Sequence, residues 1–138
     1  MKEADLVQFA STCRNAMEGW ATRSGSMFHR FPIGACGDAT NLIGRLLKEH
    51  FGLNGEYVCG EQHPTLASGN HAWYEAAGYI IDITHDQFED TGLVGWVFPL
   101  SSTWHTSFGE IERSTYCEGW FGYPYDAYAA MLAALEAR

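Results

Sequence analysis

The sequence predicts an α+β domain in which helices pack on one small antiparallel β-sheet. Apolar residues recur at helical spacing in two segments of the first half, and two strand-like runs follow on either side of a short Gly-containing turn. The chain has 138 residues, of which 46% are hydrophobic. This length suffices for one core and leaves little room for a second. We therefore expect a single domain over residues 1–138.

A first helix is predicted over residues 5–22, before a Ser-Gly-Ser break at 24–26. Its apolar stripe consists of Leu6, Phe9, Ala10, Cys13, Ala16, Met17 and Trp20. A free cysteine usually packs as a small buried hydrophobe. We therefore expect Cys13 in the core.

Residues 31–40 are predicted as a loop that leads into an amphipathic helix over 41–50, which Gly52 should end. Cys36 falls where this loop turns into the helix. A cysteine in the first turn of a helix faces unpaired N–H groups and the positive end of the helix dipole, and both favour thiolate over thiol. Asp38, two residues later, is expected to hold the same helix N-terminus.

Three strands are predicted next, over residues 55–60, 71–75 and 79–84, with a loop over 61–69 between the first two. Residues 76–78 join the last two strands. If Tyr74 pairs with Tyr79, His71 lies directly opposite Asp82 on one face of the sheet, with Cβ atoms roughly 5 Å apart. That arrangement suits a carboxylate that orients an imidazole base.

The last third of the chain is expected to supply one strand within residues 94–100, another over 115–117, and a closing helix over 123–138. The sequence contains no internal repeat and no low-complexity linker. Aromatic residues at 104 and within 118–123 lie in polar or Gly-rich stretches, where they could wall a substrate groove. Core packing is the favoured interpretation of these aromatic side chains, because large aromatic residues dominate the cores of small domains.

Several short motifs together resemble a known family. These are Phe-Pro at 31–32, Cys-Gly-Asp-Ala-Thr at 36–40, His-Ala-Trp-Tyr-Glu at 71–75, Ile-Asp-Ile-Thr at 81–84 and Asp-Gln-Phe at 86–88. The run looks like the papain-like and transglutaminase-like cysteine hydrolases of bacteria. The resemblance implies a papain-like/transglutaminase-like fold and a catalytic triad of Cys36, His71 and Asp82. Papain-type enzymes also carry a Gln several residues before the Cys, and residues 29–31 contain none.

A triad of this kind would work through a thioacyl-enzyme on amide, isopeptide or glutamine side-chain bonds, as a protease, deamidase or transglutaminase. The N–H of Cys36 can serve as one oxyanion donor. Candidates for the second are Arg30, Gln62, Asn70, Trp104 and His105. Asp86 and Gln87 are expected mainly to shape the turn after the strand. The alternative is a catalytically silent member of the fold, which acts as a protein-binding module or a delivered effector.

Charge limits the partners. Eight Lys and Arg against 17 Asp and Glu give a formal charge of −9, which disfavours nucleic acid and anionic membranes. We expect a protein or peptide substrate, neutral or basic, and no cofactor, and the oligomeric state stays open. A zinc site is a weaker alternative, in which Cys59, His63 and His71 converge with Cys36 or His85.

Residues 1–5 are acidic and lead into a helical pattern, so we expect no secretory signal and a cytoplasmic location. In that compartment the four cysteines stay reduced. Delivery as an effector by a specialised route stays open.

Overall fold

A computed structural model describes residues 1–21, 30–66, 69–115 and 125–137 of the chain. The elements in chain order are α1 (Glu3–Ala21), α2 (Cys36–Phe51), β1 (Gly55–Glu61), β2 (Asn70–Ala76), β3 (Tyr79–Ile81), the 3-10 helix η1 (His85–Gln87), β4 (Val97–Pro99), α3 (Thr103–Thr106), β5 (Glu110–Thr115) and α4 (Tyr125–Glu136). Helices and an antiparallel sheet thus share the described residues, and the α+β class is confirmed.

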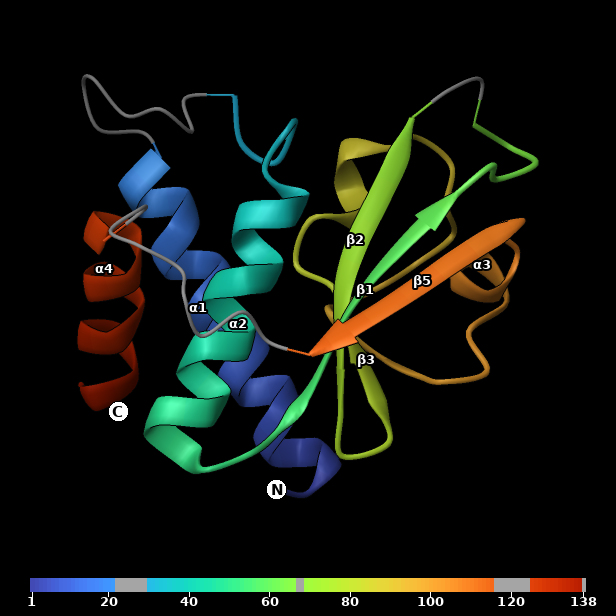
Figure 1. Cartoon of the computed structure of the whole chain (residues 1–138). Coiled ribbons are helices and arrows are strands. Elements are labelled where there is room, and N and C mark those ends of the chain that lie inside the picture. The colour runs from blue at the N-terminus through green and yellow to red at the C-terminus, as the bar shows by residue number, and fades with distance from the viewer. Residues whose placement is uncertain (22–29, 67–68, 116–124, 138) are drawn as a thin grey trace.

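The five strands form one sheet in the order β4-β3-β2-β1-β5, with every neighbouring pair antiparallel. Figure 1 shows α1, α2 and α4 together on one side of the sheet and α3 on the other. β2 is the middle strand of the sheet, and His71, its second residue, is completely buried.

The alternation of side chains along the strands divides the core into two clusters. The larger one joins α1, α2 and α4 to one face of the sheet and includes Tyr74, Ala76 and Ile81. The smaller cluster covers the other face and consists of Val58, Trp73, Ile80, Phe98, Trp104 and Phe108. Cys13 is completely buried in the larger cluster, as its place in the apolar stripe predicts.

α2 begins at Cys36, so the prediction of a loop up to residue 40 is wrong by five positions. The loop ends earlier because Gly34, at φ 75°, turns the chain and Ala35 then serves as the N-cap without a side-chain hydrogen bond. The helix ends as predicted at Gly52, which adopts φ 65° and donates its N–H to the carbonyl of Lys48. Cys36 is therefore the first residue of a 16-residue helix.

The hairpin of β2 and β3 has a shorter turn than predicted. Ala77 and Gly78 both adopt positive φ, at 54° and 85°, and Ala76 pairs with Tyr79. A two-residue turn of this type matches the strand twist, so Ala76 stays in the strand. Tyr74 consequently pairs with Ile81 and not with Tyr79. The shift is an even number of residues, so it keeps every side chain on its predicted face.

The later elements agree with the prediction in part. β4 lies within the predicted strand 94–100, and α4 lies within the predicted helix 123–138, whose ends fall outside the described residues. β5 begins earlier than the predicted strand 115–117, of which residues 116 and 117 are outside the described part. No helix among the described residues is long and apolar enough to cross a membrane.

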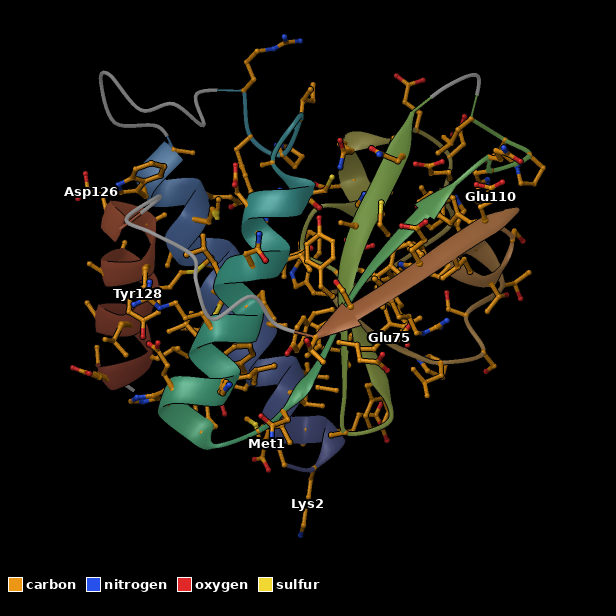
Figure 2. The ribbon with its side chains drawn as sticks, in the orientation of Figure 1. Met1, Lys2, Glu75, Glu110, Asp126 and Tyr128 are labelled. Carbon is orange, nitrogen blue, oxygen red and sulfur yellow. The ribbon has the colours of Figure 1, made fainter. Side chains whose placement is uncertain are left out.

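α4 is joined to α2 by polar contacts as well as by the core. The guanidinium of Arg45 lies 4.5 Å from the centre of the Tyr128 ring, and the Tyr128 hydroxyl donates to Glu49 at 2.8 Å. Tyr128 is labelled on α4 in Figure 2. α2 is thus held from both sides, by α4 and by the sheet.

α2 approaches β2 closely at Gly44, and this contact yields a test of the packing. A Cβ at Gly44 would lie 2.6 Å from Cε1 of the buried Tyr74 ring, whereas a Cβ at Gly19 of α1 would meet no described atom within 4 Å. We expect Gly44→Ala to lower the free energy of unfolding by about 1–3 kcal/mol, because the ring has no room to move. Gly19→Ala should leave it equal or raise it by up to about 1 kcal/mol. Urea unfolding of both variants measures the difference, and equal stabilities would contradict the packing described.

Candidate active site

Cys36 is the first residue of α2. The starts of α2 and β2 lie at the same end of the fold (Figure 1). The Cys36 side chain is hydrogen-bonded to the imidazole of His71, and its sulfur accepts the backbone N–H of Ala72. In the described part of the chain, β3 pairs with β2 only as far as Tyr74, which leaves this edge of β2 without a strand at His71 and Ala72. The Cys36 sulfur therefore receives an N–H that a longer β3 would have used.

His71 and Asp82 form a fully buried pair. Nε2 of His71 donates to Oδ2 of Asp82 at 2.8 Å, and both side chains are 0% exposed. Asp82 follows β3 directly, and the hairpin register continued by one residue sets it opposite Trp73, diagonal to His71 on the same face. Because Nε2 is bound to Asp82, Nδ1 is the ring nitrogen left for Cys36. The structure thus brings Cys36, His71 and Asp82 together in that order.

Asp82 also accepts hydrogen bonds from two further groups. Its Oδ2 accepts from Nε2 of His105 at 2.8 Å, and its Oδ1 accepts the backbone N–H of Thr84 at 3.1 Å. An ionised carboxylate only accepts hydrogen bonds, so both imidazole nitrogens that face it carry protons. The carboxylate is therefore surrounded by donors.

His105 is 1% exposed, so it is unavailable to a substrate, and the prediction that it could be an oxyanion donor is wrong. Its Nδ1 lies 2.7 Å from the hydroxyl oxygen of Ser102, so a neutral ring accepts that hydroxyl proton while Nε2 serves Asp82. Sequence reasoning missed this role. The only signal was the Ser102-to-His105 spacing of one helical turn, and the contact with Asp82 depends on where α3 packs.

The electrostatics favour an ionised pair between Cys36 and His71. Burial would lower the pKa of His71, but the charge and hydrogen bond of Asp82, followed by the contact with Cys36, raise it to about 9. Burial would raise the pKa of Cys36, but the hydrogen bond and charge of His71 and the N–H of Ala72 outweigh it and lower that pKa. Burial likewise opposes ionisation of Asp82, yet the charge of His71 and the hydrogen bonds from His105 and His71 hold its pKa well below the ordinary range.

These shifts also determine how the pair affects stability. The pKa of His71 is higher in the folded state than its ordinary 6.5. Its contribution to the free energy of unfolding is therefore complete below pH 6.5 and is lost as the pH rises through about 9. The pKa of Asp82 is lower than its ordinary 3.8, so its contribution is complete above pH 3.8 and is lost under stronger acid. His71 and Asp82 therefore both stabilise the folded state fully between pH 3.8 and pH 6.5.

Arg14 of α1 holds the segment that follows Asp82. It donates to the backbone carbonyl of Ile83 at 2.7 Å and to both carboxylate oxygens of Asp86, at 2.7 and 2.9 Å. Its guanidinium lies between the rings of Phe31 and Trp96, 4.6 and 4.5 Å from their centres. Asp86, assigned to the turn by the sequence, is thus an ion-pair partner that fixes residues 83–87 against α1.

Aromatic rings enclose His71. Those of Phe88, Trp104 and Trp73 lie 5.1, 5.6 and 5.9 Å from the imidazole, measured between ring centres. Trp104 is only 9% exposed and also packs on Phe108, so the core-packing interpretation is confirmed for it and the groove-wall hypothesis is not. The predicted aromatic wall within residues 118–123 lies outside the described residues.

Polar groups of β1 and of α2 lie near Cys36. Tyr57 and Cys59 are close enough that the charge of Cys36 adds to burial in raising the pKa of each. Burial also raises the pKa of Asp38, which lies in the first turn of α2 as predicted, although the helix has no side-chain cap hydrogen bond. Cys59 is thus a partly exposed thiol with a raised pKa, and it lies close to the Cys36 thiol, whose pKa is lowered.

Gln87 lies in the turn after β3, as predicted, and it has a second contact there. Its amide nitrogen lies 3.3 Å from Nδ1 of His71, so it belongs to the site as well as to the turn. The Asp-Gln-Phe motif at 86–88 was the available signal. Arg30, Gln62 and Asn70 are exposed, and none of them bonds to Cys36 or His71 in the part of the chain that the structure describes.

The zinc alternative finds no ligand set. His63 is bound to the carbonyl of Trp104 at 2.7 Å and to Thr65, and His85 is bound to the carbonyl of Gly95. Among the described residues, no three His, Cys, Asp or Glu side chains gather in a way that could hold a metal ion.

No family model and no curated protein matches the chain. One solved structure, described only as a genomics target, aligns with 99% of this chain and 79% of its own chain, at 12% identity and a TM-score of 0.49. A likeness at this level carries no argument about fold or function. The chemistry of the site is therefore inferred from its own geometry.

The role of Arg14 can be tested through stability. We expect Arg14→Met to lower the free energy of unfolding by about 2 kcal/mol, because the buried carbonyl of Ile83 then lacks its donor. Arg113→Met is the matched control, since its pair with Glu75 is long, at 3.3 Å, and Arg113 is half exposed. Such a pair contributes at most about 1 kcal/mol. Urea unfolding measures both, and an equal loss in the two variants would contradict the role assigned to Arg14.

The charge of Asp82 can be tested on the pKa of His71. In Asp82→Asn the main cause of the raised pKa is gone while burial remains, so the pKa of His71 should fall from about 9 to below 6.5. An NMR titration of the imidazole reads this directly. Asp90→Asn, at an exposed position, should leave the titration unchanged. A pKa that stays near 9 in Asp82→Asn would show that Asp82 does not set it.

Proposed function

We propose that the protein is a cysteine hydrolase or acyltransferase that works through a thioacyl-enzyme on Cys36. The observation that supports this most is the series of contacts from Cys36 to His71 and from His71 to a buried, ionised Asp82. A buried carboxylate that raises the pKa of an imidazole beside a thiol is an arrangement for thiolate formation at neutral pH. A papain-like/transglutaminase-like fold for the whole chain is part of the same proposal.

In the first half-reaction the thiol proton moves to Nδ1 of His71, and Asp82 stabilises the resulting imidazolium. The thiolate of Cys36 attacks the carbonyl carbon of an amide, so that a C–S bond forms and the carbonyl π electrons move to oxygen. When the oxyanion collapses, the C–N bond breaks and the leaving amine takes the proton from Nδ1. A thioester on Cys36 and a free amine remain.

In the second half-reaction an acceptor attacks the thioester. Water, deprotonated by Nδ1 of His71, yields a carboxylic acid, whereas an amine yields a new amide. In both cases the C–S bond breaks and Cys36 leaves as thiolate. The same residues therefore serve a protease, a deamidase and a transglutaminase.

The surroundings of Cys36 favour a neutral or basic protein or peptide as substrate. Asp38 lies two residues away in α2, and the charges of Glu61 and Glu112 reach the neighbouring thiol of Cys59. The chain as a whole carries a formal charge of −9. A basic segment would be attracted to this side of the molecule and an acidic one repelled.

Hydroxylamine provides a test that does not require the natural acceptor. Added to the protein with a mixture of peptides, it intercepts a thioacyl-enzyme and leaves a hydroxamate on the acyl group. A hydroxamate on glutamine side chains indicates attack on the side-chain amide, and one at a new C-terminus indicates attack on a peptide bond. We expect wild type to form hydroxamates and Cys36→Ala to form at least about 10³-fold fewer.

Cys59→Ser serves as the control for a neighbouring thiol and should behave as wild type. His71→Ala should lose activity together with Cys36→Ala, because the two residues act as a unit. Equal hydroxamate yields in wild type and Cys36→Ala would overturn the proposal and favour a catalytically silent binding module.

A further inference from the structure

The second imidazole on the Asp82 carboxylate has a hydroxyl on its other side. Nε2 of His105 donates to Oδ2 of Asp82 at 2.8 Å, and the hydroxyl of Ser102 donates to Nδ1 of His105 at 2.7 Å. The same Oδ2 accepts Nε2 of His71, whose Nδ1 faces Cys36. Two pairs of a nucleophile and an imidazole therefore share one carboxylate oxygen, and both use the ring nitrogens in the same way.

The hydroxyl of Ser102 is committed to His105 and not to the helix it precedes. A serine at the N-cap usually accepts an N–H of the first helical turn. The structure describes every residue of α3, and the Ser102 side chain makes no such hydrogen bond. Its backbone is fixed, because its N–H donates to the carbonyl of Pro99 at 2.9 Å and its carbonyl accepts the N–H of Thr106 at 3.0 Å. Ser102 is partly exposed, so a reagent can reach the hydroxyl.

The imidazole of His105 is held in a dry and rigid setting. It is 1% exposed, and aromatic rings surround it at 4.8, 5.1 and 5.5 Å between ring centres, those of Trp73, Trp104 and Phe98. With its Nε2 proton on Asp82, the neutral ring presents the lone pair of Nδ1 to Ser102. A nucleophile bonded to a base that a third group orients is the arrangement of a catalytic triad, which is recognised by geometry and not by position in the sequence.

A second hydroxyl and imidazole in the same region provide an internal comparison. The hydroxyl of Thr65 lies 2.8 Å from Nδ1 of His63, and Nε2 of His63 donates to the carbonyl of Trp104 at 2.7 Å. Here a neutral carbonyl stands where His105 has a carboxylate. Thr65 is exposed, but no anion at that carbonyl would stabilise an imidazolium. The carboxylate therefore distinguishes Ser102 from Thr65.

We propose that Ser102 is a second nucleophile of this protein, with His105 as its general base and Asp82 as the group that orients the base, and that it takes acyl groups from carboxylic esters. Oγ of Ser102 forms a bond to the carbonyl carbon while Nδ1 of His105 takes the hydroxyl proton. When the tetrahedral adduct collapses, the C–O bond to the alcohol breaks and the alcohol takes that proton. Water, deprotonated by Nδ1, then releases the carboxylic acid and restores the Ser102 hydroxyl.

The charge of His71 explains the choice of esters over amides. At neutral pH His71 is an imidazolium, since its pKa is about 9. A proton taken up by His105 would place a second positive charge at the same carboxylate oxygen, and the two charges repel each other. Ser102 therefore suits substrates with a good leaving group. The shared carboxylate also couples the two nucleophiles, because loss of the charge on His71 makes protonation of His105 easier.

A fluorophosphonate tests the nucleophile directly. In this reaction the P–O bond to serine forms, the P–F bond breaks and fluoride leaves, while the hydroxyl proton goes to the base. We expect a covalent adduct on Ser102, located by mass spectrometry, in wild type and equally in Cys36→Ala. Thr65 and Ser107 should stay unlabelled in the same protein. Ser107 is a matched control, because it is also partly exposed but donates to the carbonyl of Thr103 at 2.6 Å.

Two glutamine substitutions test the base and the coupling. His105→Gln keeps an N–H donor for Asp82 but has no base for Ser102, so labelling should slow by at least about 100-fold. His71→Gln removes the positive charge and keeps a donor, so labelling of Ser102 should become about 3–10-fold faster. With p-nitrophenyl acetate, Cys36→Ala should still release nitrophenolate, and the double variant with Ser102→Ala should lose that release.

The outcomes separate this inference from the function proposed for Cys36. No adduct on Ser102 in wild type, or labelling no faster than that of Thr65 and Ser107, would overturn it and leave the hydroxyl as a structural partner of His105. Equal labelling in folded His105→Gln would also overturn it, because His105 would then be no base. Labelling of Ser102 in a protein whose Cys36 forms no hydroxamate would support this inference while the function proposed for Cys36 fails.

Discussion

The buried carboxylate of Asp82 is the constraint on which the site depends. A completely buried carboxylate stays ionised only if hydrogen bonds and an opposite charge replace the water it has lost. Two imidazoles and one backbone N–H do this here. Their arrangement fixes the ring of His71, and the fixed ring in turn presents Nδ1 to Cys36. The burial of the Asp82 carboxylate thus determines how the His71 ring is oriented toward Cys36.

The fold supplies each of these donors from a different element. His71 comes from the middle strand, His105 from a short helix on the far face of the sheet, and Thr84 from the segment after β3. Arg14 of α1 holds that segment through Ile83 and Asp86. α2 then places Cys36 against the part of β2 that β3 leaves uncovered. A site assembled from so many elements requires the whole domain to be folded.

The sequence predicts the elements that follow local rules. Helical spacing identified α1 and α2, the alternating strands identified β1 and β2, and a positive-φ glycine ended α2 at Gly52. Because strand side chains alternate, the pair of His71 and Asp82 was predicted on one face even though the turn, and hence the register, was wrong by two residues. Contacts that depend on tertiary packing could not be predicted. His105 and Arg14 reach the site from elements far away in sequence, and no local pattern specifies those contacts.

The most direct test of the central claim is the ionisation of Cys36 itself. The ultraviolet absorbance of the thiolate, taken as the difference between wild type and Cys36→Ala, gives its titration curve without any substrate. A pair with His71 predicts a midpoint clearly below the ordinary thiol value of about 8.5. A midpoint at or above that value would contradict the thiolate–imidazolium pair and, with it, the chemistry inferred for the site.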